Sequence, residues 1–355
     1  MNLFALIMAG GVGSRFWPRS KEKTPKQLLQ IFGQNTMIQD TVDRLNGIIP
    51  QNNIFIVTNK LQKEEIQKQL PSIPSENIIE EPFGKNTAAC IGYASLIIKE
   101  KAKDAVTIVL PADHIIKNIS AFHKTLQTAA KFANESKGLV TIGIIPTRPE
   151  TGYGYIQFDD AIVGEGIHKV LTFAEKPNYA TAVRFLESGD FLWNSGMFIW
   201  RIDSILEEIK IFMPELNDGL ETIKKHLHSE NFDEVLAQVY GQLRSVSIDY
   251  GIMEKSQKVY LIKGDFGWSD VGSWEEVYQL SPKDNDGNAI IGKVFVDDTS
   301  ESYIYSPDKF TAVIGAENFI IINTNDSLLV CRRDKAQDVK KVIEHLKFNK
   351  LNDHL

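Results

Sequence analysis

The chain has 355 residues, which is long enough for a large hydrophobic core and more than one domain. Hydrophobic residues make up 43% of it, charged residues 24%, and the net charge is −7, a composition that is ordinary for a globular protein and argues against a broad nucleic-acid surface. Because no run of eighteen apolar residues and no secretory leader is found, we expect a cytoplasmic protein without a membrane segment. Its two cysteines, Cys90 and Cys331, are expected to be free thiols.

Short β-branched runs alternate with helical periodicity up to about residue 145. The runs predict strands, and the periodic stretches predict helices: strands at Phe4–Ala9, Asn53–Thr58, Asn77–Glu80, Ala105–Leu110 and Leu139–Ile144, helices at Met37–Leu45, Leu61–Gln69, Thr87–Lys101 and Ala121–Asn134. Thr36 and Asn86 precede two of these helices and are expected to cap them. We therefore predict an α/β fold with a mostly parallel sheet covered on both faces, which binds ligands beyond the carboxyl ends of its strands.

Residues 150–280 mix both kinds of pattern. "YGYIQF" and "HKVLTFAEKP" are typical of strands, and "NYATAVRFLESG" and "IDSILEEIKIFMPEL" are typical of helices. The polar stretch "SPKDNDGN" predicts a linker, so we expect one domain over residues 1–282 and another over residues 283–355. The second contains short β-prone runs about ten residues apart, which indicate a sandwich, barrel or solenoid, and a final helix at about Lys335–Phe348.

The first loop, in "FALIMAGGVGSRFWPRSKEKTPKQ", joins a strand to glycines and then to a cationic stretch. Gly10, Gly11 and Gly13 are followed between Arg15 and Lys26 by five cations and one acid, in a chain of opposite net charge. Glycine amides approach a phosphate without side chains intervening, so the pattern favours an anion site over a glycine turn beside a solvated basic loop. It is neither a Rossmann fingerprint, which needs a glycine at the position of Phe16, nor a P-loop.

Two aspartates are candidate metal ligands. Asp113, in "VLPADH", follows an apolar strand and so is expected at the ligand edge of the sheet, although a cap or turn role fits its local sequence equally well. Asp270 lies in "GDFGWSDVGSW". Magnesium is commonly held by one or two carboxylates together with substrate phosphates, so these two side chains form a possible pair. The sequence alone does not show that they meet.

Three further motifs contain polar groups in unusual settings. Lys176 follows a strand in "AEKP", where a lysine suits a single phosphate, and Asn194 and Ser195 interrupt an apolar run, so they need either backbone partners or sugar hydroxyls. In "EEPFGKNTAA", Gly84 and Asn86 precede a helix start, and Glu80 or Glu81 is either a guanine acceptor or a surface carboxylate. No serine, cysteine or histidine arrangement indicates a covalent mechanism. Glycine amides, arginine, lysine and one metal are sufficient for nucleotidyl transfer.

Taken in order, these motifs resemble one family. "LIMAGGVGSRFWPRSKEKTPKQLL", "EPFGKNTAA", "LPADH", "TGYGYI", "FAEKP", "WNSGMFIW", "SIDYGIMEK" and "GWSDVGSW" are similar to the bacterial mannose-1-phosphate guanylyltransferases, members of the sugar nucleotidyltransferases. The resemblance implies a Rossmann-like nucleotidyltransferase core and a C-terminal β region, in several relatives a left-handed β-helix stub used in dimer contacts, so we expect a homodimer. The implied reaction converts GTP and α-mannose 1-phosphate into GDP-mannose and pyrophosphate.

The resemblance also implies roles for particular residues. Gly10, Gly11, Gly13, Ser14 and Arg15 would bind the nucleotide phosphates, Lys26 the α-phosphate, Gly84, Asn86 and Thr87 the base and ribose, Asp113 and Asp270 a Mg²⁺ or Mn²⁺ ion, and Gly154, Glu175, Lys176 and Asn194 the mannose phosphate. Lys85 and Ala89 depart from the arginine and proline that many members carry there. Because the chain ends at Leu355, before the isomerase domain of bifunctional relatives, we expect no isomerase activity. A different sugar 1-phosphate as substrate, or a non-catalytic nucleotide-sugar sensor, are the alternatives.

Overall fold

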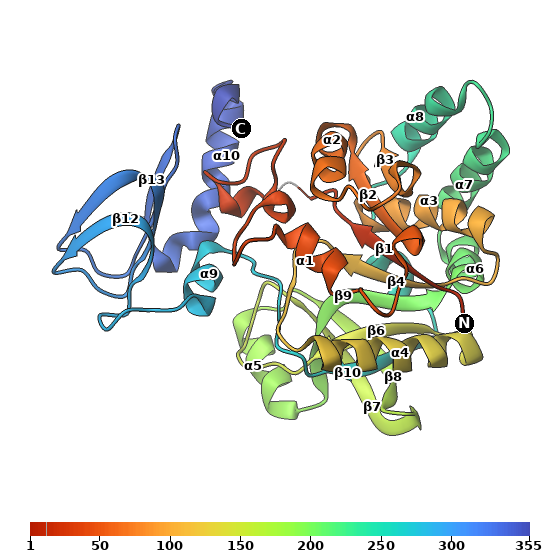
Figure 1. Ribbon diagram of the computed structural model, residues 1–355. Coiled ribbons are helices and arrows are strands. Elements are labelled where there is room, and N and C mark those ends of the chain that lie inside the picture. Colours follow the sequence, from red (N-terminus) through yellow and green to blue (C-terminus); the bar gives the residue numbers. More distant parts are fainter. Residues whose placement is uncertain (12) are drawn as a thin grey trace. The chain divides into compact units, whose positions relative to one another are not determined.

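The computed structural model describes residues 1–11 and 13–355 (Figure 1). These residues form two compact units. Unit 1 comprises residues 1–10 and 41–269, and unit 2 comprises residues 11–40 and 270–355. Cys90 and Cys331 are both free thiols, as expected. Within the described residues, every helix is too short or too polar to cross a lipid bilayer.

Unit 1 is built on a sheet whose strand order is β3-β2-β1-β4-β9-β6-β10-β8-β7. Its strands are β1 (Leu3–Met8), β2 (Ile54–Asn59), β3 (Ile78–Glu81), β4 (Val106–Pro111), β6 (Leu139–Ile144), β7 (Gly154–Gly164), β8 (Ile167–Glu175), β9 (Phe191–Arg201) and β10 (Val259–Gly264). The pairings give seven strands one direction, and β8 and β9 the other. The predicted α/β fold with a mostly parallel sheet is confirmed.

Helices cover both faces of this sheet. The helices of unit 1 are α2 (Lys60–Gln69), α3 (Asn86–Lys101), α4 (Ile119–Ser136), α5 (Tyr179–Ser188), α6 (Ile202–Phe212), α7 (Pro214–His226) and α8 (Phe232–Gln242). Phe4 and Leu6 of β1 belong to the apolar core formed with α3 and α6, and the alternate residues Ala5 and Ile7 are also fully buried. Because successive side chains of a strand face opposite sides, burial of all four requires cover on both faces.

The structure also corrects several boundaries. The helix predicted over "IDSILEEIKIFMPEL" is two helices, because Pro214 favours the first turn of a helix and cannot donate a hydrogen bond within one. Asn86 is not the capping residue of α3. Lys85 holds that position, and Asn86 has φ +66° with its side chain accepting from the amide of Thr87. The run "WNSGMFIW" forms most of β9, which the sequence did not predict as a strand.

Unit 2 joins the cationic loop to the C-terminal β region. The loop contains two short 3₁₀ turns, Ser14–Phe16 and Lys26–Leu28, and helix α1 (Met37–Asp43) begins in this unit. After α9 (Trp274–Leu280) come β12 (Ala289–Asp297), β13 (Tyr303–Ile314), β14 (Phe319–Asn323), β15 (Leu328–Arg332), the 3₁₀ turn Arg333–Val339 and α10 (Lys340–Phe348). Since β12, β13 and β14 pair in parallel, the arrangement is that of a short solenoid.

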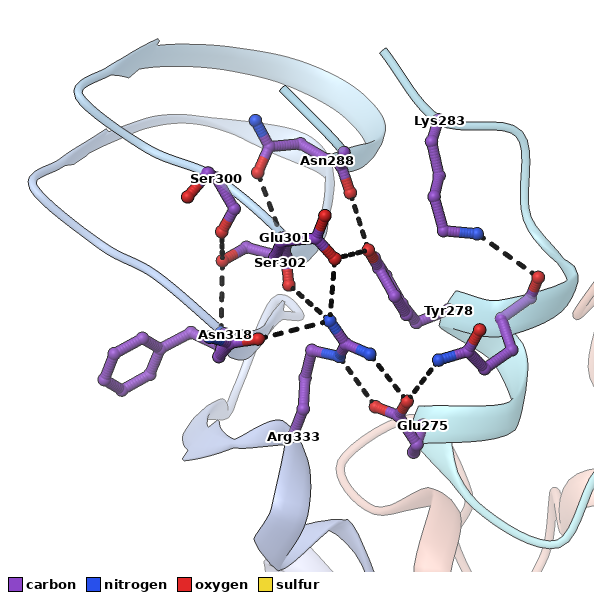
Figure 2. Close-up of polar contacts among 12 residues, drawn as sticks. Glu275, Tyr278, Lys283, Asn288, Ser300, Glu301, Ser302, Asn318 and Arg333 are labelled. Carbon is purple, nitrogen blue, oxygen red and sulfur yellow. Dashed lines mark hydrogen bonds and ion pairs between the residues drawn. The ribbon is translucent and has the colours of Figure 1, made fainter. Parts of the chain in front are cut away.

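Arg333 joins α9 to the β region, as Figure 2 shows. Its Nε and Nη2 each donate to the carboxylate of Glu275 at 2.8 Å, and its Nη1 donates to the Glu301 carbonyl at 3.0 Å. The guanidinium lies 3.7 Å from the ring centre of Tyr278, whose hydroxyl is 2.7 Å from the Glu301 carboxylate. Because one planar guanidinium bonds both to the helix α9 and to the β region, Arg333 fixes the position of α9 against the β region.

Candidate functional site

Unit 2 places the predicted phosphate loop around Lys26. Gly13 has φ +57°, and a Cβ built on it would lie 2.7 Å from the Cβ of Lys26, so only glycine fits there. Lys26 is 4% exposed, and its ammonium group donates to the carbonyl oxygen of Asp270. The side chain of Gln27 donates to the Gly11 carbonyl at 3.0 Å. Lys26 is therefore held between the glycine loop and the segment that contains the predicted metal ligand.

The remaining predicted residues of unit 2 lie close to this arrangement or at the surface. A Cβ on Gly272 would be 3.2 Å from Oδ2 of Asp270, so glycine fits closely beside this carboxylate, and the Gly272 amide donates to the Glu276 carboxylate. Ser14 and Arg15 lie in the 3₁₀ turn that follows Gly13. Arg15 is exposed.

Asp113 lies where the sequence predicted, in the turn after β4. The amide of Ala112 donates to the Met8 carbonyl at 3.1 Å, so this turn adjoins the end of β1, where the strand order of the sheet reverses. Asp113 is half-buried. The described residues contain no group of three or more His, Cys, Asp or Glu side chains arranged to hold a metal.

The predicted base segment follows β3 in unit 1. Gly84 and Asn86 are exposed, whereas the Thr87 hydroxyl accepts the amide of Ile248 at 2.8 Å. The ammonium group of Lys85 donates to the Leu243 carbonyl at 2.8 Å. Residues 85–87 are thus tied to the chain around residues 243–248.

The structure distinguishes the two carboxylates considered for guanine. Glu80 is in a surface ion pair with Lys63 at 3.7 Å. Glu81 is buried, accepts the Tyr240 hydroxyl at 3.2 Å, and has Oε2 3.8 Å from the position of a Cβ on Gly10. Burial raises the pKa of Glu81 to about 7. Glu81 is therefore the one that borders the glycine loop.

Three of the four predicted sugar-phosphate residues converge on neighbouring strands. β7 pairs with both β8 and β9, so Gly154 lies opposite Glu175, and a Cβ on Gly154 would be 2.6 Å from the Glu175 carboxylate and 3.7 Å from Nδ2 of Asn194. Lys176 follows β8 with φ +45° and pairs with Glu175 at 2.8 Å. Ser195 instead donates to the Ile142 carbonyl at 2.6 Å, so its role is structural.

Asp249 is a residue of this cluster that sequence reasoning did not single out. It begins a short π-helical turn, Asp249–Met253, and accepts Nδ2 of Asn194 at 2.7 Å. Burial and, next, the nearby Glu175 raise the pKa of Asp249. A carboxylate between apolar residues in "SIDYGIM" was the available signal, because a buried acid needs a partner.

Comparison with known proteins agrees with this architecture. A family model described as nucleotidyl transferase matches residues 4–287, and one described as a MannoseP isomerase/GMP-like β-helix domain matches residues 292–346. A mannose-1-phosphate guanylyltransferase of Escherichia coli is 39% identical over 357 residues, covering 99% of this chain and 75% of that protein. One from Salmonella typhimurium is 39% identical over 359 residues, covering 100% and 74%. A solved structure of a mannose-1-phosphate geranyltransferase from Thermus thermophilus is 30% identical, covers 98% of this chain and 100% of that one, and has a TM-score of 0.88.

Proposed function

This chain belongs to the mannose-1-phosphate guanylyltransferase family of nucleotidyl transferases, and we propose that it transfers GMP from GTP to α-D-mannose 1-phosphate, giving GDP-mannose and pyrophosphate. The observation that carries the proposal is the 39% identity to an enzyme of that name over 99% of the chain. The glycine loop around Lys26 and the polar cluster at Gly154 supply the two kinds of group that such a reaction needs, namely phosphate-binding amides with cations and sugar-binding acceptors.

The chemical problem is repulsion between two phosphorylated substrates. The phosphate of the sugar attacks the α-phosphorus of GTP in line, and pyrophosphate leaves from the opposite side. We assign Lys26 to the α-phosphate, Arg15 to the leaving diphosphate and Lys176 to the attacking phosphate. Support comes from Lys26, which is fixed by its contact with the Asp270 carbonyl and so needs little reorganisation. Arg15 is exposed and Lys176 is on a strand end, where incoming anions reach them.

We further propose that Asp113 and Asp270 hold a divalent cation, Mg²⁺ or Mn²⁺. Carboxylate oxygens are the donors that these hard cations prefer, and a side chain at position 272 would crowd the Asp270 carboxylate, since a Cβ there would lie 3.2 Å from its Oδ2. The cation would neutralise charge on the triphosphate. Strands β5 (Ile115–Ile116) and β11 (Trp268–Ser269) pair with Ser269 opposite Ile115; Asp270 directly follows Ser269, and Asp113 precedes Ile115 by two residues. That register supports the pairing of the two aspartates.

The C-terminal β region is proposed as the surface of a homodimer, with residues 1–282 as the catalytic domain and 283–355 as the dimerising one. Large apolar side chains on this region are exposed, among them Phe295 at 51%, Phe310 at 74% and Ile314 at 67%. An exposed apolar surface of this kind is typical of an interaction site. Light scattering of the purified chain tests the proposal, which a monomer at micromolar concentration would contradict.

A pyrophosphate-release assay tests the function. Purified protein with GTP and Mg²⁺ is expected to turn over mannose 1-phosphate faster than other hexose 1-phosphates, and ATP or UTP is expected to replace GTP poorly. Asp113→Asn and Asp270→Asn should each lower turnover by on the order of 10²–10³-fold without unfolding the protein. Absence of turnover at saturating substrates would refute the function, and near-full activity of either variant would refute the metal assignment.

A further inference from the structure

We propose that Asp249 binds a hydroxyl group of the sugar and so helps to determine which sugar 1-phosphate is accepted. The inference rests on the proposed function, because it concerns the same sugar-phosphate site. It starts from three groups that meet at one point of the sheet: the carboxylate of Glu175, the amide of Asn194 and the carboxylate of Asp249.

Gly154 allows the side chains of Glu175 and Asn194 to lie close against the backbone of β7. A Cβ there would collide with the Glu175 carboxylate at 2.6 Å and lie 3.5 Å from the Cβ of Asn194. Only glycine therefore lets the Glu175 carboxylate take this position beside Asn194. A hexose presents several hydroxyl donors, and carboxylate oxygens are the strongest acceptors for them.

The carboxylate of Asp249 is held in place by Asn194. Oδ1 accepts from Nδ2 of Asn194 at 2.7 Å, and Oδ1 of Asn194 accepts from the Gly196 amide at 3.0 Å, which fixes the orientation of the Asn194 side chain. The same carboxylate also accepts a hydrogen bond from its own backbone amide. Its position is set by the π-helical turn, a distortion that is common at functional sites.

The charged groups around Asp249 favour a neutral donor as its ligand. Glu175 and Glu254 face it as acids, Lys176 faces it as a cation, and Lys176 already pairs with Glu175 at 2.8 Å. An incoming phosphate would be repelled by these acids, whereas a hydroxyl carries no charge and donates a hydrogen bond. The sugar ring is therefore assigned to Asp249 and its phosphate to Lys176.

The test combines variants with substrate analogues. kcat/KM is measured for mannose 1-phosphate and its 2-, 3-, 4- and 6-deoxy analogues, with wild type, Asp249→Asn and Asp249→Glu. On wild type, removal of the bound hydroxyl is expected to cost about 10- to 100-fold, and on Asp249→Asn the same removal is expected to cost less than about 3-fold. Asp203→Asn is the matched control, because Asp203 pairs with Arg201 at 2.9 Å elsewhere in unit 1.

The outcomes separate the possible roles of Asp249. If the decrease in kcat/KM caused by one deoxy analogue disappears in Asp249→Asn while KM for GTP is unchanged, Asp249 binds that hydroxyl directly. Identical penalties for all four analogues in wild type and Asp249→Asn would overturn the inference and leave Asp249 only to orient Asn194. Asp249→Glu keeps the charge and replaces the Asn variant in this test if that variant does not fold. Penalties equal to those of wild type in Asp249→Glu would likewise overturn the inference. If wild type itself does not turn over mannose 1-phosphate, the proposed function fails instead.

Discussion

Replacing Gly13 by alanine tests the glycine loop most directly. Alanine in a left-handed conformation costs about 1–2 kcal/mol, and Gly13 has φ +57°. The new Cβ would also lie 2.7 Å from the Cβ and 2.8 Å from the amide nitrogen of Lys26, and overpacking of this kind costs about 1–3 kcal/mol. We therefore expect the free energy of unfolding to fall by about 2–5 kcal/mol. Because Lys26 is the group that is displaced, kcat should fall by on the order of 100-fold.

Gly11→Ala is the matched control for this prediction. A Cβ on Gly11 meets no atom within 4 Å among the described residues, and its φ is not positive, so the variant is expected to unfold at the wild-type urea concentration. Its activity then reports separately on how closely the loop backbone approaches the phosphates. Urea denaturation followed by tryptophan fluorescence, together with pyrophosphate release, measures both effects. If Gly13→Ala were as stable as wild type, the steric reasoning would be wrong.

Three other substitutions have expected outcomes. Arg333→Lys keeps the charge but loses the bidentate contact with Glu275. Urea denaturation should therefore show a decrease of about 2–4 kcal/mol in the free energy of unfolding. An unchanged denaturation midpoint would argue against a stabilising role for the Arg333–Glu275 contact. Glu81→Gln concerns a carboxyl whose folded pKa, about 7, exceeds its ordinary value of 4.5. The unfolding free energy of the wild type is therefore expected to fall by about 2.5 kcal/mol between pH 5 and pH 8 relative to that of the variant. Parallel pH profiles would contradict this. Lys26→Met should lower kcat by on the order of 10²–10³-fold with little change in unfolding, and wild-type turnover would remove Lys26 from the mechanism.

Local patterns predicted most elements of the core because helix and strand periodicity act over a few residues. β6 has the predicted bounds Leu139–Ile144, and α3 begins one residue before the predicted start. β9 was not predicted as a strand because Asn194, Ser195 and Gly196 interrupt its apolar pattern. The hydroxyl of Ser195 is satisfied by the carbonyl of Ile142, a residue distant in the sequence, and no local signal announces such a partner.

In the candidate site, too, the sequence located single residues but not the contacts between them. Motifs located Gly154, Glu175 and Asn194 separately, and the pairing of β7 with β8 and β9 brings them together. The sequence could not predict that pairing, because it depends on which strands become neighbours in the sheet. Asp249 was missed for a related reason: its partner Asn194 lies 55 positions away, and a single carboxylate in an apolar stretch does not reveal its partner.

Residues 243–249 of unit 1 connect the predicted base segment with the predicted sugar cluster. They are tied to the base segment by three hydrogen bonds: Lys85 to the Leu243 carbonyl, the Ala88 amide to the Val246 carbonyl, and the Ile248 amide to the Thr87 hydroxyl. The next residue, Asp249, bonds Asn194 of the sugar cluster. Since a hydrogen-bonded segment moves as a unit, a substitution that displaces residues 243–248 is expected to change the apparent affinities for GTP and for the sugar phosphate together. A substitution at Asn194 leaves the three hydrogen bonds to the base segment in place, so it is expected to change the apparent affinity for the sugar phosphate more than that for GTP.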